Sequence, residues 1–310
     1  MPEGDVVYQA ARRLDAALAG RIIETNKFRL PGYGTLDLTG CRVNSAVSRG
    51  KHLLIRVADV SIHTHMAVMG RWDVYATGER SRTPAVKASV VLRNDAFQAV
   101  GFDLEYMRVI RTSDEPQAVG HLGPDPLGHS WDPAEAERRL ASNPERPIGL
   151  ALLDQRLIAG LGKVYRSEIL FLACTNPRTP VGEVEDLARI VDLAHKLMEA
   201  NKDRPMRSTT PATLDSPYSV FARGGEPCLR CSDPVVHERF GPDSPLGKPV
   251  AAVNRGRAGG ASRAAVFDDN RDLAGRDLFW CPQCQPLPGQ GAVPEPGRAA
   301  HLGSAGSLPG

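Results

Sequence analysis

Residues 147–171 read Pro147-Ile-Gly-Leu-Ala-Leu-Leu-Asp-Gln-Arg-Leu-Ile-Ala-Gly160-Leu-Gly162-Lys163-Val-Tyr-Arg-Ser-Glu-Ile-Leu-Phe171. Apolar residues recur at helical spacing up to Ile158, the pattern breaks at residues 160–162, and it resumes from Lys163. This order predicts a helix, a tight turn with two glycines, and a second helix that begins with a basic residue. Amides at such a turn and the N-terminus of the second helix can bind a phosphate, so Gly160, Gly162 and Lys163 are candidate phosphate contacts. An ordinary helical hairpin, in which glycine turns are common, is the alternative.

Three further helices are predicted on either side of this stretch. Residues 5–18 place apolar side chains on one helical face, with Asp5 as the expected N-cap and Gly20 as the expected stop. A helix from Asp132 to about residue 141 has proline at its first position, where proline is favoured. The last one covers about residues 183–200 and again has one apolar face.

Residues 21 to about 112 have the pattern of short β-strands. Apolar runs at residues 53–57, 61–66, 90–92 and 107–110 are separated by turn residues. Several short strands at this spacing predict an antiparallel sandwich or barrel. The chain is therefore expected to be an α+β protein, with a strand-rich first domain, a helical second domain and a boundary in the loop of residues 123–128.

The segment Met1-Pro2-Glu3-Gly4-Asp5 is a candidate for covalent chemistry. If Met1 is removed, Pro2 carries a free secondary amine; an α-amino group has a pKa of about 7.7–8.0, so part of it is neutral at neutral pH. Such an amine attacks an aldehyde-like carbon to give an iminium, which withdraws electrons from the neighbouring carbon. Glu3 could transfer protons as an acid or a base. Proline after methionine is common, so this motif alone does not establish the chemistry.

A second basic candidate lies in Arg49-Gly50-Lys51-His52. Gly50 would let the backbone turn, and Lys51 would then open a strand. A solvated strand end is the ordinary interpretation of Lys51. His63 and His65 alternate on one strand face, where most histidines are hydrogen-bonded parts of the structure rather than ligands.

Composition limits the classes of function. The chain has 310 residues, 42% of them hydrophobic, and a formal net charge of +2. This length suggests two domains, or one with additions. Bulk charge is too small to bind nucleic acid, so any such surface must come from local patches. The sequence shows neither an apolar run of transmembrane length nor the pattern of a signal peptide, so we expect a cytoplasmic protein without a membrane span.

Two CxxC pairs predict a metal site. The pairs are Cys228 with Cys231 and Cys281 with Cys284, and without a signal peptide they favour a tetrahedral four-cysteine zinc site over disulfides. We expect one structural zinc ion, which would supply much of the folding energy of this small segment. The long gap holds a basic, Gly- and Pro-rich stretch at residues 241–267, predicted to be flexible and either to touch a phosphate backbone or to be a solvated loop.

Six motifs follow one another along residues 1–285: Met1-Pro-Glu-Gly-Asp5, Arg49-Gly-Lys51-His52, Leu153-Asp-Gln through Gly160-Leu-Gly162, Tyr165-Arg-Ser-Glu168, Arg223-Gly-Gly-Glu-Pro-Cys228, and Arg276 through Gln285. In this order and spacing they resemble the formamidopyrimidine-DNA glycosylase and endonuclease VIII family, in its endonuclease VIII-like branch. The resemblance implies an N-terminal antiparallel β-sandwich (residues 1–123), a helix–two-turn–helix domain (129–224), and a zinc-finger β-hairpin (225–286). Residues 287–310, rich in Gly, Pro and Ala, are expected to form a disordered tail.

The same resemblance implies a bifunctional DNA glycosylase and AP lyase of base excision repair. Pro2 would attack C1′ of a damaged nucleoside, Glu3 would move protons, and β,δ-elimination would then cut the strand. The resemblance also implies that Lys51 contacts a phosphate and helps the chemistry. The phosphates that flank the lesion would be clamped by Gly160, Gly162, Lys163 and Arg276. Val68 and Met69 would fill the space that the flipped nucleotide leaves. For Val68 and Met69, core packing is the alternative. The expected partner is damaged double-stranded DNA with oxidised pyrimidines, bound by a monomer associated with the bacterial nucleoid.

Three departures from the family pattern bear on this interpretation. Lys163 stands where the family usually has asparagine, Val6 stands where many relatives carry a second carboxylate, and the zinc hairpin is lengthened by its insertion. The sequence leaves open whether Asp5 covers for the missing carboxylate. The alternatives are a non-catalytic relative that clamps damaged or abasic DNA, and a zinc-containing adaptor unrelated to repair.

Overall fold

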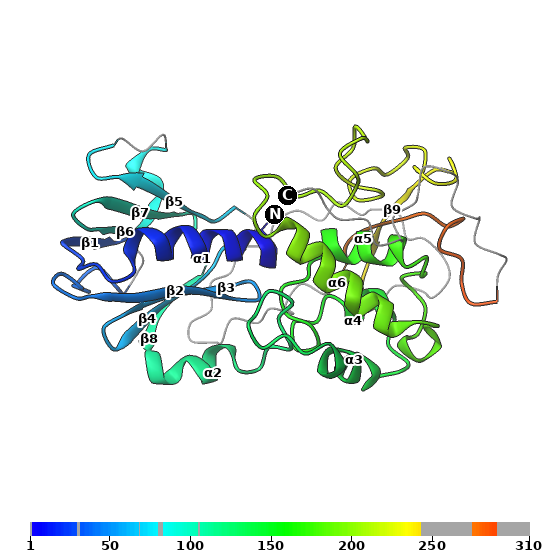
Figure 1. Ribbon diagram of the computed structural model, residues 1–310, viewed down its shortest axis with the longest axis horizontal. Helices are drawn as coiled ribbons and strands as arrows, with labels where there is room; N and C mark the ends of the chain where they lie inside the picture. The colour runs from blue at the N-terminus through cyan, green and yellow to red at the C-terminus, as the bar shows by residue number, and fades with distance from the viewer. Residues whose placement is uncertain are drawn as a thin grey trace.

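The computed structural model describes residues 2–29, 32–67, 69–79, 83–104, 106–242 and 275–289. In this part of the chain, a strand-rich N-terminal unit is followed by a unit of helices and one β-hairpin (Figure 1). Helix α1 (Gly4–Leu18) belongs to the first unit, and its N-terminal end points toward the second (Figure 1).

The N-terminal unit contains two four-stranded antiparallel sheets, as the strand pattern predicted. One has the order β1 (Thr25–Phe28), β6 (Ala88–Arg93), β7 (Phe97–Phe102) and β5 (Arg71–Ala76). The other has the order β2 (Val43–Arg49), β3 (His52–Val57), β4 (Val60–His65) and β8 (Tyr106–Arg111). Short 3-10 turns, η1 (Ala85–Lys87) and η2 (Thr112–Asp114), flank β6 and β8.

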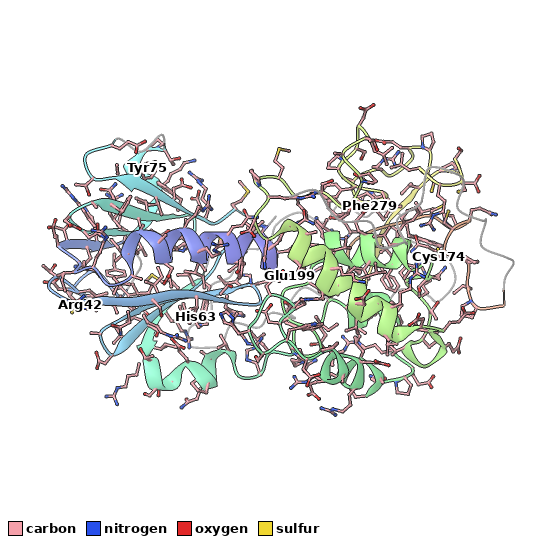
Figure 2. The ribbon with its side chains drawn as sticks, in the orientation of Figure 1. Arg42, His63, Tyr75, Cys174, Glu199 and Phe279 are labelled. Carbon is pink, nitrogen blue, oxygen red and sulfur yellow. The ribbon has the colours of Figure 1, made fainter. Side chains whose placement is uncertain are left out.

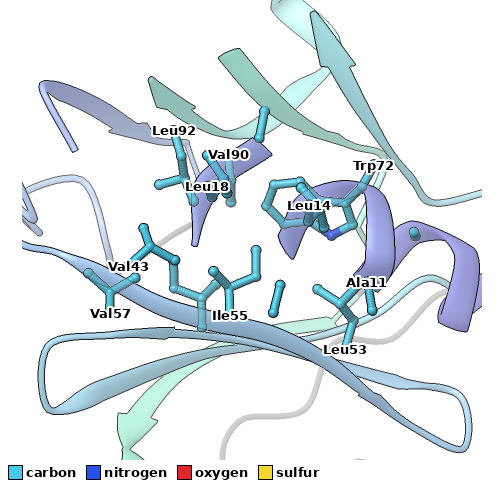
Figure 3. Close-up of a cluster of buried hydrophobic side chains, with 14 of the residues drawn as sticks. Ala11, Leu14, Leu18, Val43, Leu53, Ile55, Val57, Trp72, Val90 and Leu92 are labelled. Atoms are coloured by element: carbon cyan, nitrogen blue, oxygen red, sulfur yellow. The ribbon is translucent and has the colours of Figure 1, made fainter. Parts of the chain in front are cut away.

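Helix α1 fills the space between these sheets. Ala11, Leu14 and Leu18 lie on its buried face (Figure 3). They pack against residues of both sheets, namely Trp72, Val90 and Leu92 on one side and Val43, Leu53, Ile55 and Val57 on the other (Figure 3). The expected N-cap was wrong, because Glu3 holds the extended cap position and Asp5 is a buried residue of the first turn. Gly20, with φ of +77°, follows the helix end as predicted.

Five helices follow β8 in the described residues; the first lies against the N-terminal unit and the other four build the second (Figure 1). They are α2 (Glu115–Val119), α3 (Pro133–Ala141), α4 (Ile148–Ala151), α5 (Lys163–Leu172) and α6 (Leu187–Asn201), with a 3-10 turn η3 (Val181–Glu183). Helix α3 begins as predicted, with the Asp132 side chain accepting a hydrogen bond from the Glu135 amide (3.1 Å). Helix α6 begins four residues later than predicted, because Asp186 caps it by accepting from the Arg189 amide (2.8 Å).

The helix predicted up to Ile158 is mostly a folded turn. Only α4 is helical there, and the apolar residues after it are buried in a chain of turns that runs to Gly162. Two polar side chains draw the backbone out of the helix. Asp154 accepts a hydrogen bond from the Arg156 amide (3.0 Å), and Gln155 accepts one from the Gly160 amide (2.9 Å). Such side-chain contacts compete with helical hydrogen bonds, and periodicity alone does not reveal them.

A β-hairpin closes the described structure. Strand β9 (Val236–Phe240) pairs with β10 (Arg276–Trp280), which gives the β-hairpin that the family resemblance implied. Phe279 lies in this unit beside α5, and Cys174 lies beyond the C-terminal end of that helix (Figure 2). The predicted insertion of residues 241–267 falls outside the described residues from 243 onward, and the predicted tail does so from 290 onward. Among the described helices, none combines the length and the apolar character that crossing a bilayer requires.

Candidate functional site

Three glycines bring distant segments into backbone contact between the two units. The Gly4 amide donates to the Gly160 carbonyl (2.9 Å), which joins the start of α1 to the turn before α5. A Cβ built on Gly160 would lie 3.5 Å from Cα of Gly4 and 3.7 Å from Cα of Gly50. Gly50 and Gly160 have φ of +57° and +90°, which side chains disfavour. This glycine junction (Gly4, Gly50, Gly160) brings together the segments that carry Pro2–Glu3, Lys51 and Lys163.

The carboxylate of Glu3 sits on the N-terminus of α5. Its Oε1 accepts a hydrogen bond from the Val164 amide (2.9 Å), and its Oε2 accepts from the Gly162 amide (3.0 Å). The Tyr165 amide adds a longer contact to Oε2 (3.4 Å). Helix N-termini favour anions because their first amides have no partner within the helix. The fully buried Glu3 is thereby fixed beside Pro2 by a helix of the other unit.

Because Glu3 accepts from the turn before α5, one backbone amide of that turn is not available to a phosphate. The amide of Gly162 was expected to face a phosphate, but in this structure it donates to Glu3. A Cβ on Gly162 would lie 2.5 Å from Cδ of Glu3, so glycine is required for the approach of the carboxylate rather than for the turn itself. The contact of Gly160, Gly162 and Lys163 with a phosphate remains a prediction.

Asp5, in the first turn of α1, is held in a buried ion pair with Arg207. Its Oδ2 accepts from Nε of Arg207 (2.7 Å) and from the Tyr165 hydroxyl (3.0 Å). Burial opposes the charge of Arg207, but the negative charges of Glu3 and Asp5 outweigh it and raise the pKa of the guanidinium. Asp5 is thus engaged inside the protein, and this structure does not present it as a substitute for the carboxylate missing at Val6.

Lys51 occupies the turn between β2 and β3 and is 9% exposed. The turn is braced by Asp125, whose Oδ2 accepts from the Gly50 amide (2.6 Å), and by Arg49, which donates to the Gly123 carbonyl (2.8 Å). Burial raises the pKa of Asp125. The loop of residues 123–128, predicted as a linker, therefore includes a buried brace that positions Lys51 against the glycine junction.

A buried histidine pair lies on the strands that follow Lys51. Nδ1 of His52 is 2.8 Å from Nε2 of His63, and Figure 2 shows His63 in the sheet of β4. Both rings are buried. This agrees with the structural role expected for most histidines on a strand face.

Lys163 and Arg276 come from α5 and β10, which pack together. The ammonium of Lys163 donates to Asp277 Oδ2 (2.9 Å). The neighbouring Arg166 is fully buried, and burial together with the charge of Arg276 lowers the pKa of its guanidinium to about 9. Two basic side chains predicted to bind phosphate thus lie at one helix–hairpin junction.

The two residues predicted to fill a vacated base stack are only partly described. Met69 is 69% exposed, in the turn between β4 and β5, which excludes core packing for this side chain. Val68 lies outside the described residues. Their contact with DNA remains a prediction.

The four predicted metal ligands form one cluster. The sulfurs of Cys228, Cys231, Cys281 and Cys284 all lie within 4.8 Å of one another. Two of these distances are 3.8 Å (Cys228 to Cys284) and 3.4 Å (Cys231 to Cys281). Tetrahedral zinc, with Zn–S bonds of about 2.3 Å, places its sulfurs about 3.8 Å apart. The cluster fits a zinc-binding finger.

The acid–base chemistry of the cluster also fits a cation. The thiol of Cys281 donates to Cys228 and lowers the pKa of Cys228 to about 5. Burial, followed by donation to Cys231, raises the pKa of Cys284 to about 12. Four thiolates this close repel one another, so a bound divalent cation would be needed to hold all four deprotonated at neutral pH.

Comparisons with known proteins agree with this arrangement. The family model for the formamidopyrimidine-DNA glycosylase N-terminal domain matches residues 1–114, and the model for the H2TH domain of the same glycosylase matches residues 122–203. The "Probable endonuclease 8 2" of Streptomyces coelicolor is 43% identical over 301 residues, which cover 96% of this chain and 97% of the relative. The chain belongs to the formamidopyrimidine-DNA glycosylase and endonuclease 8 family.

Two other comparisons give a second relative by sequence and a solved structure with the same fold. The "DNA-(apurinic or apyrimidinic site) lyase Nei2" of Mycolicibacterium smegmatis is 39% identical over 242 residues, 78% of this chain and 94% of that protein. The solved formamidopyrimidine-DNA glycosylase of Lactococcus lactis, bound to DNA with an AP site, has a TM-score of 0.69 over 92% of this chain and 99% of its own, at 19% identity. The family and the fold expected from the sequence are therefore confirmed.

Sequence reasoning did not find several residues that build the site. Arg207, Asp125, Gln155 and Asp277 each hold a predicted functional segment in place. Arg207 and Asp125 lie outside the six motifs, and their partners are 202 and 75 residues away along the chain. Gln155 and Asp277 lie within motifs, but the sequence did not show that they bind the Gly160 amide and Lys163. For Asp125 and Gln155 the signal would have been the burial of a polar loop residue, and burial is not visible in the sequence.

Proposed function

We propose that this chain is a bifunctional DNA glycosylase and AP lyase of base excision repair, which removes oxidised bases, chiefly pyrimidines, from damaged double-stranded DNA. Its family and its identity to relatives named as endonucleases 8 and as an AP lyase support this. The observation that carries the proposal is the position of Glu3, which is buried directly after Pro2 with its carboxylate fixed on the α5 N-terminus.

The reaction begins at the nitrogen of Pro2 once Met1 has been removed. The amine forms a bond to C1′ of the damaged nucleotide while the bond from C1′ to the base breaks, and the base leaves with a proton. Glu3 supplies the proton that the sugar ring oxygen needs as the ring opens. The product is an iminium that joins the protein to the sugar.

The iminium then makes strand cleavage possible. It withdraws electrons from C2′, so a proton is lost there and the 3′ phosphate departs; a second elimination expels the 5′ phosphate. Glu3 lies beside the reacting nitrogen and can accept and return these protons. The three amide contacts to its carboxylate keep it oriented through both eliminations.

Basic side chains around the glycine junction would hold the DNA. Lys51, Lys163 and Arg276 are proposed to bind the phosphates that flank the lesion, which positions the sugar without reading the base sequence. Val68 and Met69 are proposed to fill the space that the flipped nucleotide leaves, and the exposure of Met69 supports this role.

The chain is expected to have three domains and one structural metal ion. We propose domains at residues 1–123, 129–224 and 225–286, with one zinc ion on the four cysteines of the finger. The ion would order the hairpin and take no part in the reaction. We further propose that the enzyme acts as a monomer on the nucleoid, in the cytoplasm.

Borohydride trapping tests this function. Duplexes carrying an abasic site or an oxidised pyrimidine are incubated with the full chain and sodium borohydride, which reduces the iminium to a stable amine. We expect a covalent adduct on both duplexes and none on undamaged DNA or on a chain extended before Pro2. Tight binding to the abasic duplex without any adduct would instead establish a non-catalytic clamp.

The approach of Glu3 to α5 can be tested with Gly162→Ala. The new methyl group would lie 2.5 Å from Cδ of Glu3 and would push the carboxylate off the helix N-terminus. A displacement of about 1 Å costs about 100-fold in rate, so we expect a loss of this order in single-turnover base excision. The backbone at Gly162, with φ of −134°, tolerates alanine, so the effect should come from the clash.

Gly34→Ala is the matched control for this variant. A Cβ at Gly34 meets no atom within 4 Å, so stability and activity should stay as in the wild type. If Gly162→Ala were as active as this control, the proposed placement of Glu3 would be wrong.

A further inference from the structure

One carboxylate lies among the basic side chains of the α5–hairpin junction. Oδ2 of Asp277 is 2.9 Å from the ammonium of Lys163, and its Oδ1 is 3.2 Å from Nε2 of His237 and 3.9 Å from the Arg239 guanidinium. The carbonyl of the same residue accepts a hydrogen bond from Arg166. Asp277 is therefore the meeting point of basic side chains from α5 and from strand β9 of the hairpin.

The strand geometry separates Asp277 from its neighbour Arg276. Successive side chains of a strand point to opposite faces, so these two residues lie on different sides of β10. Asp277 shares its face with Phe279, whose ring stacks on His237 with centroids 4.3 Å apart. Lys163 lies over this face, with its ammonium 5.9 Å from the centroid of Phe221, which in turn contacts Phe279.

The Lys163–Asp277 pair is open to competition. The two side chains are 25% and 29% exposed, so water and other anions can reach them. Burial acts to raise the pKa of Asp277, but the hydrogen bonds from Lys163 and His237 outweigh it, and the carboxyl is an anion at neutral pH. Exposed ion pairs of this kind contribute little net stability, so a DNA phosphate can displace the carboxylate at small cost.

We propose that Asp277 competes with DNA phosphate for Lys163 and so weakens binding to the phosphate backbone, the part of DNA binding that does not depend on a lesion. This inference rests on the proposed function, because it needs Lys163 to face a DNA phosphate. A DNA phosphate must break the Lys163–Asp277 ion pair and approach the Asp277 carboxylate before it can bind Lys163. Lys163 stands where the family usually has asparagine. Its positive charge is balanced by the carboxylate of Asp277 in the zinc hairpin.

Asp277→Asn tests the competition, since it keeps the shape and removes the charge. Binding to a short labelled undamaged duplex is measured from low to moderate salt. We expect about fivefold tighter binding at low salt. This corresponds to the upper end of the free energy that an ion pair at the surface contributes. The salt dependence should steepen by about one phosphate contact, because the released Lys163 neutralises one more phosphate. In a Lys163→Gln background the substitution should change neither quantity.

Asp95→Asn is the matched control. Asp95 forms an exposed pair with Arg21 in the N-terminal unit, and its replacement changes the net charge by the same amount. It should leave the affinity and its salt dependence near the wild-type values. If Asp277→Asn bound undamaged DNA no more tightly than this control, or if its gain persisted without Lys163, the proposal would be overturned.

If Asp277→Asn unfolded the hairpin, its zinc content and melting temperature would fall. Lys163→Gln then serves as a second variant that tests the competition. Lys163→Gln alone should weaken binding to undamaged duplex by less than about twofold, because Asp277 already neutralises the lysine. A tenfold loss would contradict the competition. Borohydride trapping on an abasic duplex is run alongside, so that a wild-type chain that binds DNA without forming an adduct refutes the catalytic function and not this inference.

Discussion

Glu3→Gln is expected to lower the rate of base excision by about 100-fold or more, the usual contribution of a placed acid or base. The glutamine has nearly the same shape, but it cannot shuttle protons. Its amide would also turn a donor toward the amides of Gly162 and Val164, which now donate to the carboxylate. Binding to an abasic duplex should change little, since Glu3 is fully buried and the proposed phosphate contacts are elsewhere.

Single-turnover excision of an oxidised pyrimidine measures this loss, and Glu115→Gln separates chemistry from stability. Glu115 is also buried, but it accepts hydrogen bonds from Arg56 and Ser61 within the N-terminal unit. We expect Glu115→Gln to lower the melting temperature and to keep the rate of the folded fraction. Equal rates in the two variants, each corrected for folded fraction, would remove Glu3 from the reaction.

Cys281→Ser is expected to release the zinc and to weaken binding to abasic DNA by about 100-fold or more. Hydrogen bonds to charged groups contribute about 1.5–3 kcal/mol each, and the hairpin carries Arg276, which is proposed to bind a phosphate. It also holds α5, because the Phe279 amide donates to the Ser167 hydroxyl (3.4 Å). Without its metal the hairpin has too small a core to persist.

Hydrogen exchange and zinc analysis together measure this outcome. Amides of β9 and β10 should lose protection, while those of the N-terminal sheets keep it. Cys41→Ser is the control, since Cys41 lies in the N-terminal unit outside the cluster, and it should retain one zinc per chain. A Cys281→Ser chain that lost its zinc and yet bound abasic DNA normally would show that the finger does not organise the DNA grip.

The sequence predicted those parts of the fold that local pattern determines. The apolar face of α1 and the cap of α3 at Asp132 follow from spacing and residue type within a few positions. The paired cysteines pointed to a cluster for the same reason, since each CxxC turn presents two sulfurs together. The strands of the sandwich were only partly found. Strands β1, β2, β5 and β7 were missed, and none of them alternates regularly between buried and exposed residues.

What the sequence could not show are contacts between residues far apart along the chain. Arg207 binds Asp5 across 202 residues, and Lys163 binds Asp277 across 114. Residues 152–158 were predicted as helix because the buried hydrogen bonds of Asp154 and Gln155 leave no trace in the apolar spacing. Glu3 was singled out from its motif, but its attachment to α5 depends on the packing of two domains.

The most direct test of the proposed chemistry is to locate the covalent bond. The borohydride-trapped complex with an abasic duplex is digested with protease and nuclease, and the modified peptide is sequenced by mass spectrometry. We predict that the sugar remnant is carried by the nitrogen of Pro2, in a peptide that lacks Met1. A remnant on Lys51 or on any other lysine, or an adduct on a chain that retains Met1, would contradict the mechanism.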